Sequence, residues 1–283
     1  MHRTVTAKNG TTLRPKNRSA LRIALGNACY GTARKLSWLL HAGRFARQQV
    51  PPLPFLQFAH HTPLLRKLKD VDMEYQYNKI INLRLAVKKL NGVVVRPGET
   101  LSYWRLVGKP TRRAGYVDGM ILRGGKVCSG VGGGLCQLSN LIFWMTLHTP
   151  LTVTERHRHG YDVFPDANRT QPFGSGATCF YPHGDLMIQN NTEEAFQLIV
   201  WVGEENLYGE WRAMSPPTVE YRIVERAHRM QLEPWGGYSR HNELWRETID
   251  DGQIICEELV VHNDAMMMYA PFLPEALIKE EQD

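Results

Sequence analysis

Residues 136–148 are the most restrictive stretch of this sequence, because they show helical spacing without a polar face. Apolar side chains cover nearly every side of the expected helix, namely Leu138, Leu141, Ile142, Phe143, Trp144, Met145 and Leu147. A helix that is apolar all round is stable only when other elements surround it. The chain must therefore build a core in which this helix is central.

The rest of the chain is richer in predicted strands than in helices. β-branched runs between tight turns predict strands at 93–95, 120–123, 126–128, 152–155, 185–189, 195–202, 207–212 and 219–226, and a hairpin of 244–249 with 254–261. Helices are predicted from 19 to about 48, with Ser19 as N-cap, and from 77 to 90. We therefore expect an α+β fold, an antiparallel β-rich domain packed around helix 136–148 with N-terminal helices beside it.

Charge is distributed unevenly along the chain. Residues 1–69 hold thirteen Lys or Arg and no Asp or Glu, although the whole chain carries only +6. Within this stretch, the proline-rich residues 51–54 break the chain after the predicted N-terminal helix. We expect three parts: a basic N-terminal helical segment at 1–69, a central domain at 70–215, and a C-terminal β-hairpin extension at 216–283 packed on that domain.

The basic segment has two interpretations that the sequence leaves open. Residues 1–50 suit an anionic membrane surface, because clustered cations are attracted to it. They equally suit a cationic helix that docks on the acidic remainder of the chain. Nucleic acid is the weakest partner, since no zinc finger, recognition-helix pattern or RNP-like aromatic string accompanies the charge.

The hydropathy and the cysteines of the sequence predict where in the cell the protein is located. No apolar run reaches the roughly 18 to 20 residues of a membrane span, and the stretch 21–26 is too short and interrupted for an export signal. Five scattered cysteines without a CxxC pair indicate neither a disulfide scaffold nor a zinc ribbon. We expect a cytoplasmic protein, peripheral at the inner membrane face if its basic segment binds lipid.

Cys136 stands where the glycine tract 130–134 enters the buried helix. Unpaired amides and the helix dipole at such an entrance favour a thiolate, and the same amides suit the oxyanion of a tetrahedral intermediate. Gly132, Gly133 and Gly134 would also let a substrate approach closely. The alternative is that Cys136 is a small core residue.

A nucleophilic cysteine needs a base, and the histidines are the candidates. His148 is twelve residues along the helix, about 18 Å away, so we interpret it as a charge at the helix C-terminus. His157 and His159 share one face of an extended segment, and either is a candidate base or part of a structural pair. A zinc site from Cys136 and these two histidines lacks compact spacing, and no Walker or GxGxxG pattern is present, so we expect no metal or cofactor.

Three strings together resemble the VanW family. They are Arg96-Pro97-Gly98-Glu99-Thr100-Leu101-Ser102, Val131-Gly132-Gly133-Gly134-Leu135-Cys136-Gln137-Leu138-Ser139-Asn140, and Glu155-Arg156-His157. The resemblance covers residues 70 to 215 and implies a VanW-type domain there. It also implies a role at the cell envelope in glycopeptide resistance.

Some VanW domains look like cysteine-dependent L,D-transpeptidases, which act on peptidoglycan stem peptides. By that likeness Cys136 is the nucleophile, and His157 or His159 is the base. Substrate-binding positions implied by the likeness are Glu99, Gly132, Gly133, Gly134, Gln137 and Ser139. Glu99 has the alternative role of capping a turn.

The chain departs from the family pattern at Gly176, where related sequences often carry an aspartate. If that aspartate orients the imidazole, this chain must use Asp162, Asp166 or nothing. Two functions therefore remain open. One is a thiol acyltransferase that works through a thioester, and the other is a non-catalytic accessory protein that binds a peptidoglycan precursor or an envelope partner.

Overall fold

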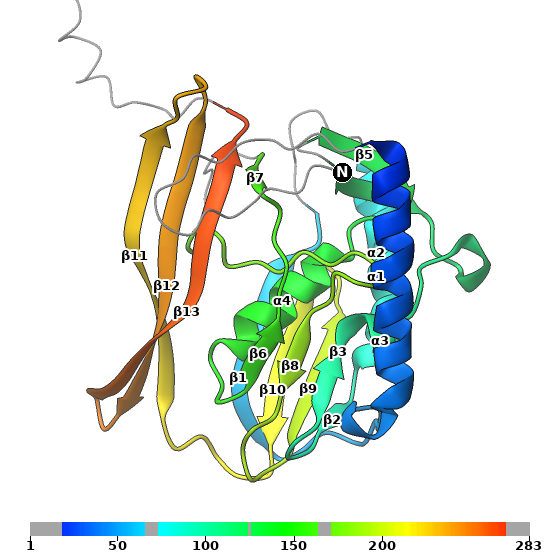
Figure 1. Cartoon of the computed structure of the whole chain (residues 1–283). Coiled ribbons are helices and arrows are strands. Elements are labelled where there is room, and N and C mark those ends of the chain that lie inside the picture. Colours follow the sequence, from blue (N-terminus) through cyan, green and yellow to red (C-terminus); the bar gives the residue numbers. More distant parts are fainter. Residues whose placement is uncertain (1–18, 66–72, 124–125, 164–170, 270–283) are drawn as a thin grey trace, which may run out of the picture.

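The computed structural model describes residues 19–65, 73–123, 126–163 and 171–269, which combine helices with mostly antiparallel sheets (Figure 1). The helices are α1 (Ala20–Leu40), α2 (Met73–Leu90), α3 (Tyr103–Val107) and α4 (Cys136–Thr146), with short 3₁₀ helices at Ala42–Arg44 and Arg112–Ala114. The strands are β1 (Phe55–Pro63), β2 (Val93–Val95), β3 (Thr100–Ser102), β4 (Asp118–Arg123), β5 (Lys126–Val131), β6 (Thr152–Glu155), β7 (Tyr161–Asp162), β8 (Met187–Gln189), β9 (Phe196–Val202), β10 (Asn206–Ala213), β11 (Glu220–Leu232), β12 (Tyr238–Asp250) and β13 (Gln253–Met267). The α+β prediction is confirmed.

The central sheet has the strand order β1-β10-β9-β2 and is antiparallel throughout. Smaller sheets are β3-β8-β6 and the hairpin β4-β5, and a longer sheet, β11-β12-β13-β7, lies to one side (Figure 1). β1 comes from the basic segment 1–69, yet it pairs along its length with β10. That segment therefore supplies an edge strand to the central sheet.

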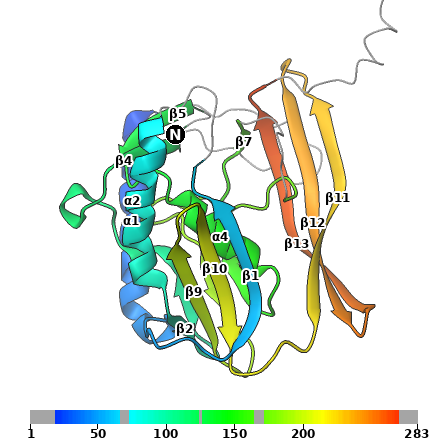
Figure 2. The ribbon, with the colours of Figure 1, turned by 180° about the vertical axis from the view of Figure 1, so that it is seen from behind.

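Helix α4 lies against β1 and β10, on the far side of the sheet in Figure 2. Leu138, Ile142 and Met145 are 0% exposed, as the all-round apolar pattern predicted. The helix ends at Thr146 rather than at 148. The amides of His148 and Thr149 donate to the carbonyls three residues back, those of Met145 and Thr146, at 3.1 Å each, so a tighter turn replaces the helical pattern.

Helix α1 begins where the sequence predicted and ends earlier. The Ser19 hydroxyl accepts a hydrogen bond from the Arg22 amide at 3.4 Å, which confirms the N-cap. The helix stops at Leu40 instead of 48, because the chain then extends and the Ala46 amide donates to Thr100 of β3 at 3.0 Å. Backbone pairing with β3 takes the place of further helical turns.

The predicted hairpins are both confirmed. β4 and β5 pair from Asp118 to Val131, and their turn at 124–125 lies outside the described residues. β12 and β13 are longer than predicted, and Asp251 and Gly252 between them have φ values of +47° and +77°. Among the helices described, none is long and apolar enough to cross a bilayer.

Candidate functional site

The glycine tract enters α4 through very close contacts with other elements. A Cβ on Gly133 would lie 2.1 Å from the carbonyl carbon of Gly119 on β4, and one on Gly134 would lie 2.2 Å from Cγ of Lys79 on α2. Gly132 and Gly134 also have φ values of +78° and +88°, where side chains are strained. Internal packing by itself thus requires glycine at these positions.

Backbone amides of the tract are largely paired. The N–H groups of residues 132–134 donate to the carbonyls of Val117, Gly130 and Met120, each at 3.0 Å. The prediction of unpaired amides that would hold an oxyanion is wrong for these three groups. The tight turns of the tract direct them to β4, to β5 and to the preceding loop instead.

Cys136 is the first residue of α4 and is partly buried. Its thiol donates to the carbonyl of Cys179 at 3.8 Å. Burial raises the pKa of the Cys136 thiol, and hydrogen bonds with the backbone of Cys179 and of Cys136 itself oppose this only in part. The predicted thiolate is therefore wrong, because desolvation outweighs the backbone hydrogen bonds that favour the charged form. At neutral pH the group is a thiol.

The segment 178–180 connects Cys136 with His157. The Thr178 amide donates to the carbonyl of His157 at 2.8 Å, and the next residue, Cys179, accepts from the Cys136 thiol. Phe180 packs edge-on against the His157 ring at 5.2 Å between centroids. Among the residues that the structure describes, no hydrogen bond joins the Cys136 sulfur to the imidazole of His157 or His159.

Glu155 orients the His157 imidazole. Nε2 of His157 lies 2.8 Å from Oε1 of Glu155, and the histidine side chain is 36% exposed. Arg34 of α1 pairs with the same carboxylate at 2.5 Å, and the Asp185 amide donates to it at 3.1 Å. Burial acts to raise the pKa of Glu155, but the hydrogen bonds from His157 and Arg34 lower it overall. The carboxylate is therefore charged and fixed in place.

The other histidines of the sequence analysis are neutral. Burial, together with the cation of Arg158, lowers the pKa of His159 to about 4. Burial also lowers the pKa of His148 to about 4, and its ring stacks on Phe58 at 4.0 Å between centroids. The predicted positive charge of His148 at the end of α4 is therefore wrong, because that end is covered by β1.

Gln137 and Ser139 lie on the first turn of α4 and bind neighbouring backbone. The Gln137 amide donates to the carbonyl of Pro63 on β1 at 2.9 Å. The buried Ser139 hydroxyl donates to the carbonyl of Ala177 at 2.7 Å. Both side chains thus anchor α4 next to Cys136.

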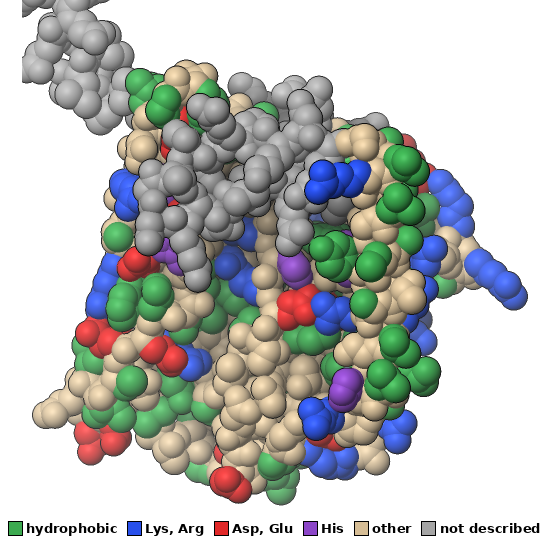
Figure 3. Space-filling model, in the orientation of Figure 1, with side chains coloured by type: hydrophobic (Ala, Val, Ile, Leu, Met, Phe, Trp, Pro, Cys, Tyr) green, Lys and Arg blue, Asp and Glu red, His purple; other side chains and the backbone are tan. Residues whose placement is uncertain are grey.

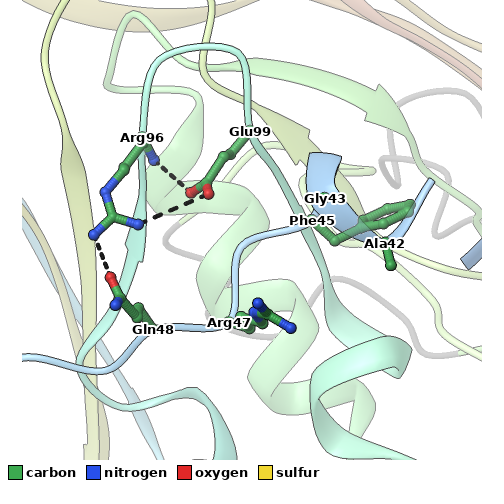
Figure 4. Close-up of a pocket in the computed structure, with 7 residues that line it drawn as sticks. All are labelled: Ala42, Gly43, Phe45, Arg47, Gln48, Arg96 and Glu99. Carbon is green, nitrogen blue, oxygen red and sulfur yellow. Dashed lines mark hydrogen bonds and ion pairs between the residues drawn. The ribbon is translucent and has the colours of Figure 1, made fainter. Parts of the chain in front are cut away.

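Glu99 lies in a different part of the molecule, in the turn between β2 and β3. Its Oε2 accepts from the Arg96 amide at 2.9 Å, so it caps that turn. It also lines a pocket of about 150 Å³ together with Ala42, Gly43, Phe45, Arg47, Gln48 and Arg96 (Figure 4). This pocket includes no residue of α4, so the structure separates Glu99 from the other predicted site residues.

Gly176 packs against α4 rather than against an imidazole. A Cβ there would lie 2.8 Å from Oδ1 of Asn140, which accepts the Ala177 amide at 2.8 Å. Arg156 donates to the Gly176 carbonyl at 2.8 Å. Burial and the neighbouring Arg158 lower the pKa of this guanidinium to about 9. A side chain at position 176 would therefore meet Asn140 first.

The predicted substitutes for the family aspartate are not beside His157. Asp162, on β7, accepts from the Tyr269 hydroxyl at 2.7 Å, and Asp166 lies outside the described residues. The carboxylate on His157 comes instead from Glu155. The sequence contained a signal for it, since residues two apart in an extended segment share a face.

Ser239, His241 and Asp264 have the spacing of a hydrolytic triad in the sheet of β12 and β13. His241 lies 2.7 Å from the Ser239 oxygen and 2.5 Å from Asp264. However, Ser239 is 0% exposed and its hydroxyl donates to Glu233 at 2.5 Å. We therefore interpret these residues as a buried polar network of the sheet. Within the described ranges, no group of three His, Cys, Asp or Glu is placed to hold a metal ion.

Comparison with known proteins places the chain in a family. It is 36% identical over 230 residues to the vancomycin B-type resistance protein VanW of Enterococcus faecalis, and the aligned region covers 81% of this chain and 83% of that protein. The chain belongs to the VanW family. The family model described as VanW like protein matches residues 78–212. The uncharacterized protein YoaR of Bacillus subtilis is 34% identical over 109 residues, 38% of this chain and 34% of that protein. No solved structure matches significantly.

The family model's range of 78–212 contains most of the Cys136 neighbourhood, but not its contacts from α1 and β1. Cys136, Glu155 and His157 lie inside it, whereas Arg34 comes from α1, outside the matched range. Nothing in the sequence pointed to Arg34, because a partner 121 residues away leaves no local pattern. The N-terminal helix therefore contributes a side chain to the candidate site.

Proposed function

We propose that this VanW-family protein acts at the cell envelope in glycopeptide resistance, as an acyltransferase for peptidoglycan stem peptides that works through a thioester on Cys136. The observation that carries the proposal is the hydrogen bond between Glu155 and His157 beside the segment that binds the Cys136 thiol. Cysteine, histidine and an orienting carboxylate are the groups that nucleophilic acyl transfer uses. A relative named for vancomycin resistance supports the envelope role.

The protonated thiol makes His157 necessary to this mechanism. Because burial raises the pKa of Cys136, a base must take the thiol proton as sulfur attacks. With Nε2 directed to Glu155, Nδ1 of His157 is the nitrogen that accepts this proton. His159 is a weaker base, since its pKa is lowered to about 4.

The reaction has two balanced steps. The Cys136 sulfur bonds to a stem-peptide carbonyl carbon, the proton passes to His157, and the C–N bond to a terminal D-alanine breaks as D-alanine takes that proton. An amine of a second stem then attacks the thioester, gives a proton to His157, and releases the sulfur, which takes the proton back. His157 thus serves as base and acid in turn.

Mass spectrometry of the full chain, incubated with a synthetic stem tetrapeptide ending in D-alanine, tests the proposal. We expect an acyl adduct on the Cys136 peptide and release of D-alanine. Glu155→Gln should slow acylation roughly 100-fold, in the range of acid–base contributions. Cys128→Ser, a partly buried cysteine on β5, is the matched control and should acylate normally. No adduct, or an adduct on another cysteine, refutes acyl transfer.

A second function is favoured by the raised pKa of Cys136, which makes the free protein a poor nucleophile. In this alternative the protein binds a stem peptide without chemistry. Calorimetry with the same tetrapeptide separates the two functions. Binding that Cys136→Ala retains, in a protein that forms no adduct, supports the accessory role.

A further inference from the structure

Helix α1 presents leucines on the side that faces away from the body of the protein. They are Leu21, Leu25, Leu36, Leu39 and Leu40, and we call them the leucine face. Their exposed fractions run from 51% to 73%. At about 3.6 residues per turn, these positions return to one side of the helix.

The opposite side of α1 holds the helix to the protein. Gly31 packs on Pro182, where a Cβ would lie 3.2 Å from Cγ, and Trp38 lies 6.3 Å from Tyr181 between ring centroids. Arg34 pairs with Glu155 on this inner side. The helix is thus anchored through small, aromatic and charged contacts, while its leucines are left outside.

Single exposed leucines are ordinary, but several on one helix face indicate a binding surface. The cations around the leucine face indicate its chemistry. Arg22 and Lys35 of α1 are exposed, as are Arg44 and Arg47 in the segment just after it, and the first 69 residues contain no Asp or Glu. Figure 3 shows hydrophobic side chains with Lys and Arg along the edge that α1 forms.

We propose that α1 lies in the headgroup region of an anionic lipid bilayer, with the leucine face toward the acyl chains and the flanking cations among the phosphates. An interfacial helix uses this combination of leucines and cations. A second copy of the chain is a poorer occupant, because pairing two such faces would bring the same cations together, and α1 carries no Asp or Glu to neutralise them. The proposal is independent of acyl transfer at Cys136.

The consequence is that the membrane contact and the candidate site share one helix. Arg34 holds Glu155 on the inner side of α1 while the leucine face binds lipid on the outer side. Lipid binding would therefore place the site next to the bilayer surface. A substrate carried at the headgroup level would meet it there.

Vesicle flotation of the full chain tests this proposal, using phosphatidylglycerol mixed with phosphatidylcholine, and phosphatidylcholine alone. We expect binding to the anionic vesicles that high salt weakens. Arg22→Gln with Lys35→Gln should weaken it roughly fivefold for each cation. Leu25→Gln with Leu39→Gln should weaken it roughly tenfold for each leucine.

Ile255→Gln with Leu259→Gln, at exposed apolar positions of β13, is the matched control and should bind as the wild type does. Circular dichroism of each variant checks that it is folded. Equal binding by the leucine variant and the wild type overturns the proposal. So does a lipid-free dimer that the leucine variant abolishes, when no vesicle binding is seen, because the occupant is then a second copy.

A fluorescent label gives an independent readout. Cys29 is exposed on α1 between Leu25 and Leu36, and Cys256 is exposed on β13. An environment-sensitive dye on Cys29 should shift to the blue when anionic vesicles are added, and the same dye on Cys256 should not. Equal shifts at both positions, or none at Cys29, contradict the proposed orientation.

Discussion

Replacing Asp185 with Asn should remove a pH-dependent cost from the folded state. Asp185 is 0% exposed, and burial raises its pKa from an ordinary 3.8 to about 6, despite hydrogen bonds from Ser102 and Trp104 that act to lower it. Oδ1 accepts the Trp104 and Leu186 amides at 2.9 Å, and Oδ2 accepts the Ser102 hydroxyl at 2.5 Å. An Asn oxygen retains both amide bonds, and its NH₂ group donates to Ser102.

The magnitude follows from the pKa difference. A rise of about two units corresponds to about 3 kcal/mol of unfolding free energy. Because the folded-state pKa is the higher one, the native protein holds a proton that the unfolded chain releases. This contribution to stability is complete below about pH 4 and is lost as pH rises through about 6. In Asp185→Asn the side chain at this position does not titrate, so its contribution to stability does not change with pH.

Urea unfolding of the wild type and Asp185→Asn across this pH range measures the difference. We expect the unfolding free energy of the variant, relative to that of the wild type, to increase by about 3 kcal/mol as the pH rises from about 4 to 8. Ser102→Ala should steepen the wild-type decline, because it removes a donor to the charged carboxylate. A difference that stays constant with pH, or that favours the wild type as pH rises, would show that burial does not raise the pKa of Asp185.

Three further predictions use other features of the fold. Gly133→Ala should lower the unfolding free energy by about 3 kcal/mol or more in urea titrations, because its Cβ would meet the backbone of β4. Gly26→Ala, at an open position of α1, should raise the unfolding free energy by about 0.5 to 1 kcal/mol. Equal effects would contradict the close approach of Gly133 to β4. Leu138→Ala should lower the unfolding free energy by roughly 3 kcal/mol and Leu39→Ala by under about 0.5, and a reversed order would refute the assignment of inner and outer leucines. The His148 ring should titrate near pH 4 by NMR, and a midpoint above about 6 would mean that its contact with Phe58 is not buried.

Local patterns in the sequence determined most of the elements. Helical spacing and an N-cap are properties of a few adjacent residues, so α2, α4 and the start of α1 were predicted closely. Turn chemistry at 251–252 likewise predicted the hairpin of β12 and β13. Element ends were less accurate, because α1 stops where pairing with β3 takes over, which depends on residues about 55 positions away.

The chemistry of the site was decided by tertiary structure. Helix polarity and glycine content favoured an ionised sulfur and open amides, but packing buried the thiol and paired the amides with β4 and its neighbours. Sequence spacing placed Glu155 on the same face as His157, yet only folding brought Arg34 of α1 to hold it. The periodicity of a sequence indicates which face of its own helix or strand a side chain occupies. The charge and partners of a buried group depend on which other elements remove it from water, and that requires the whole fold.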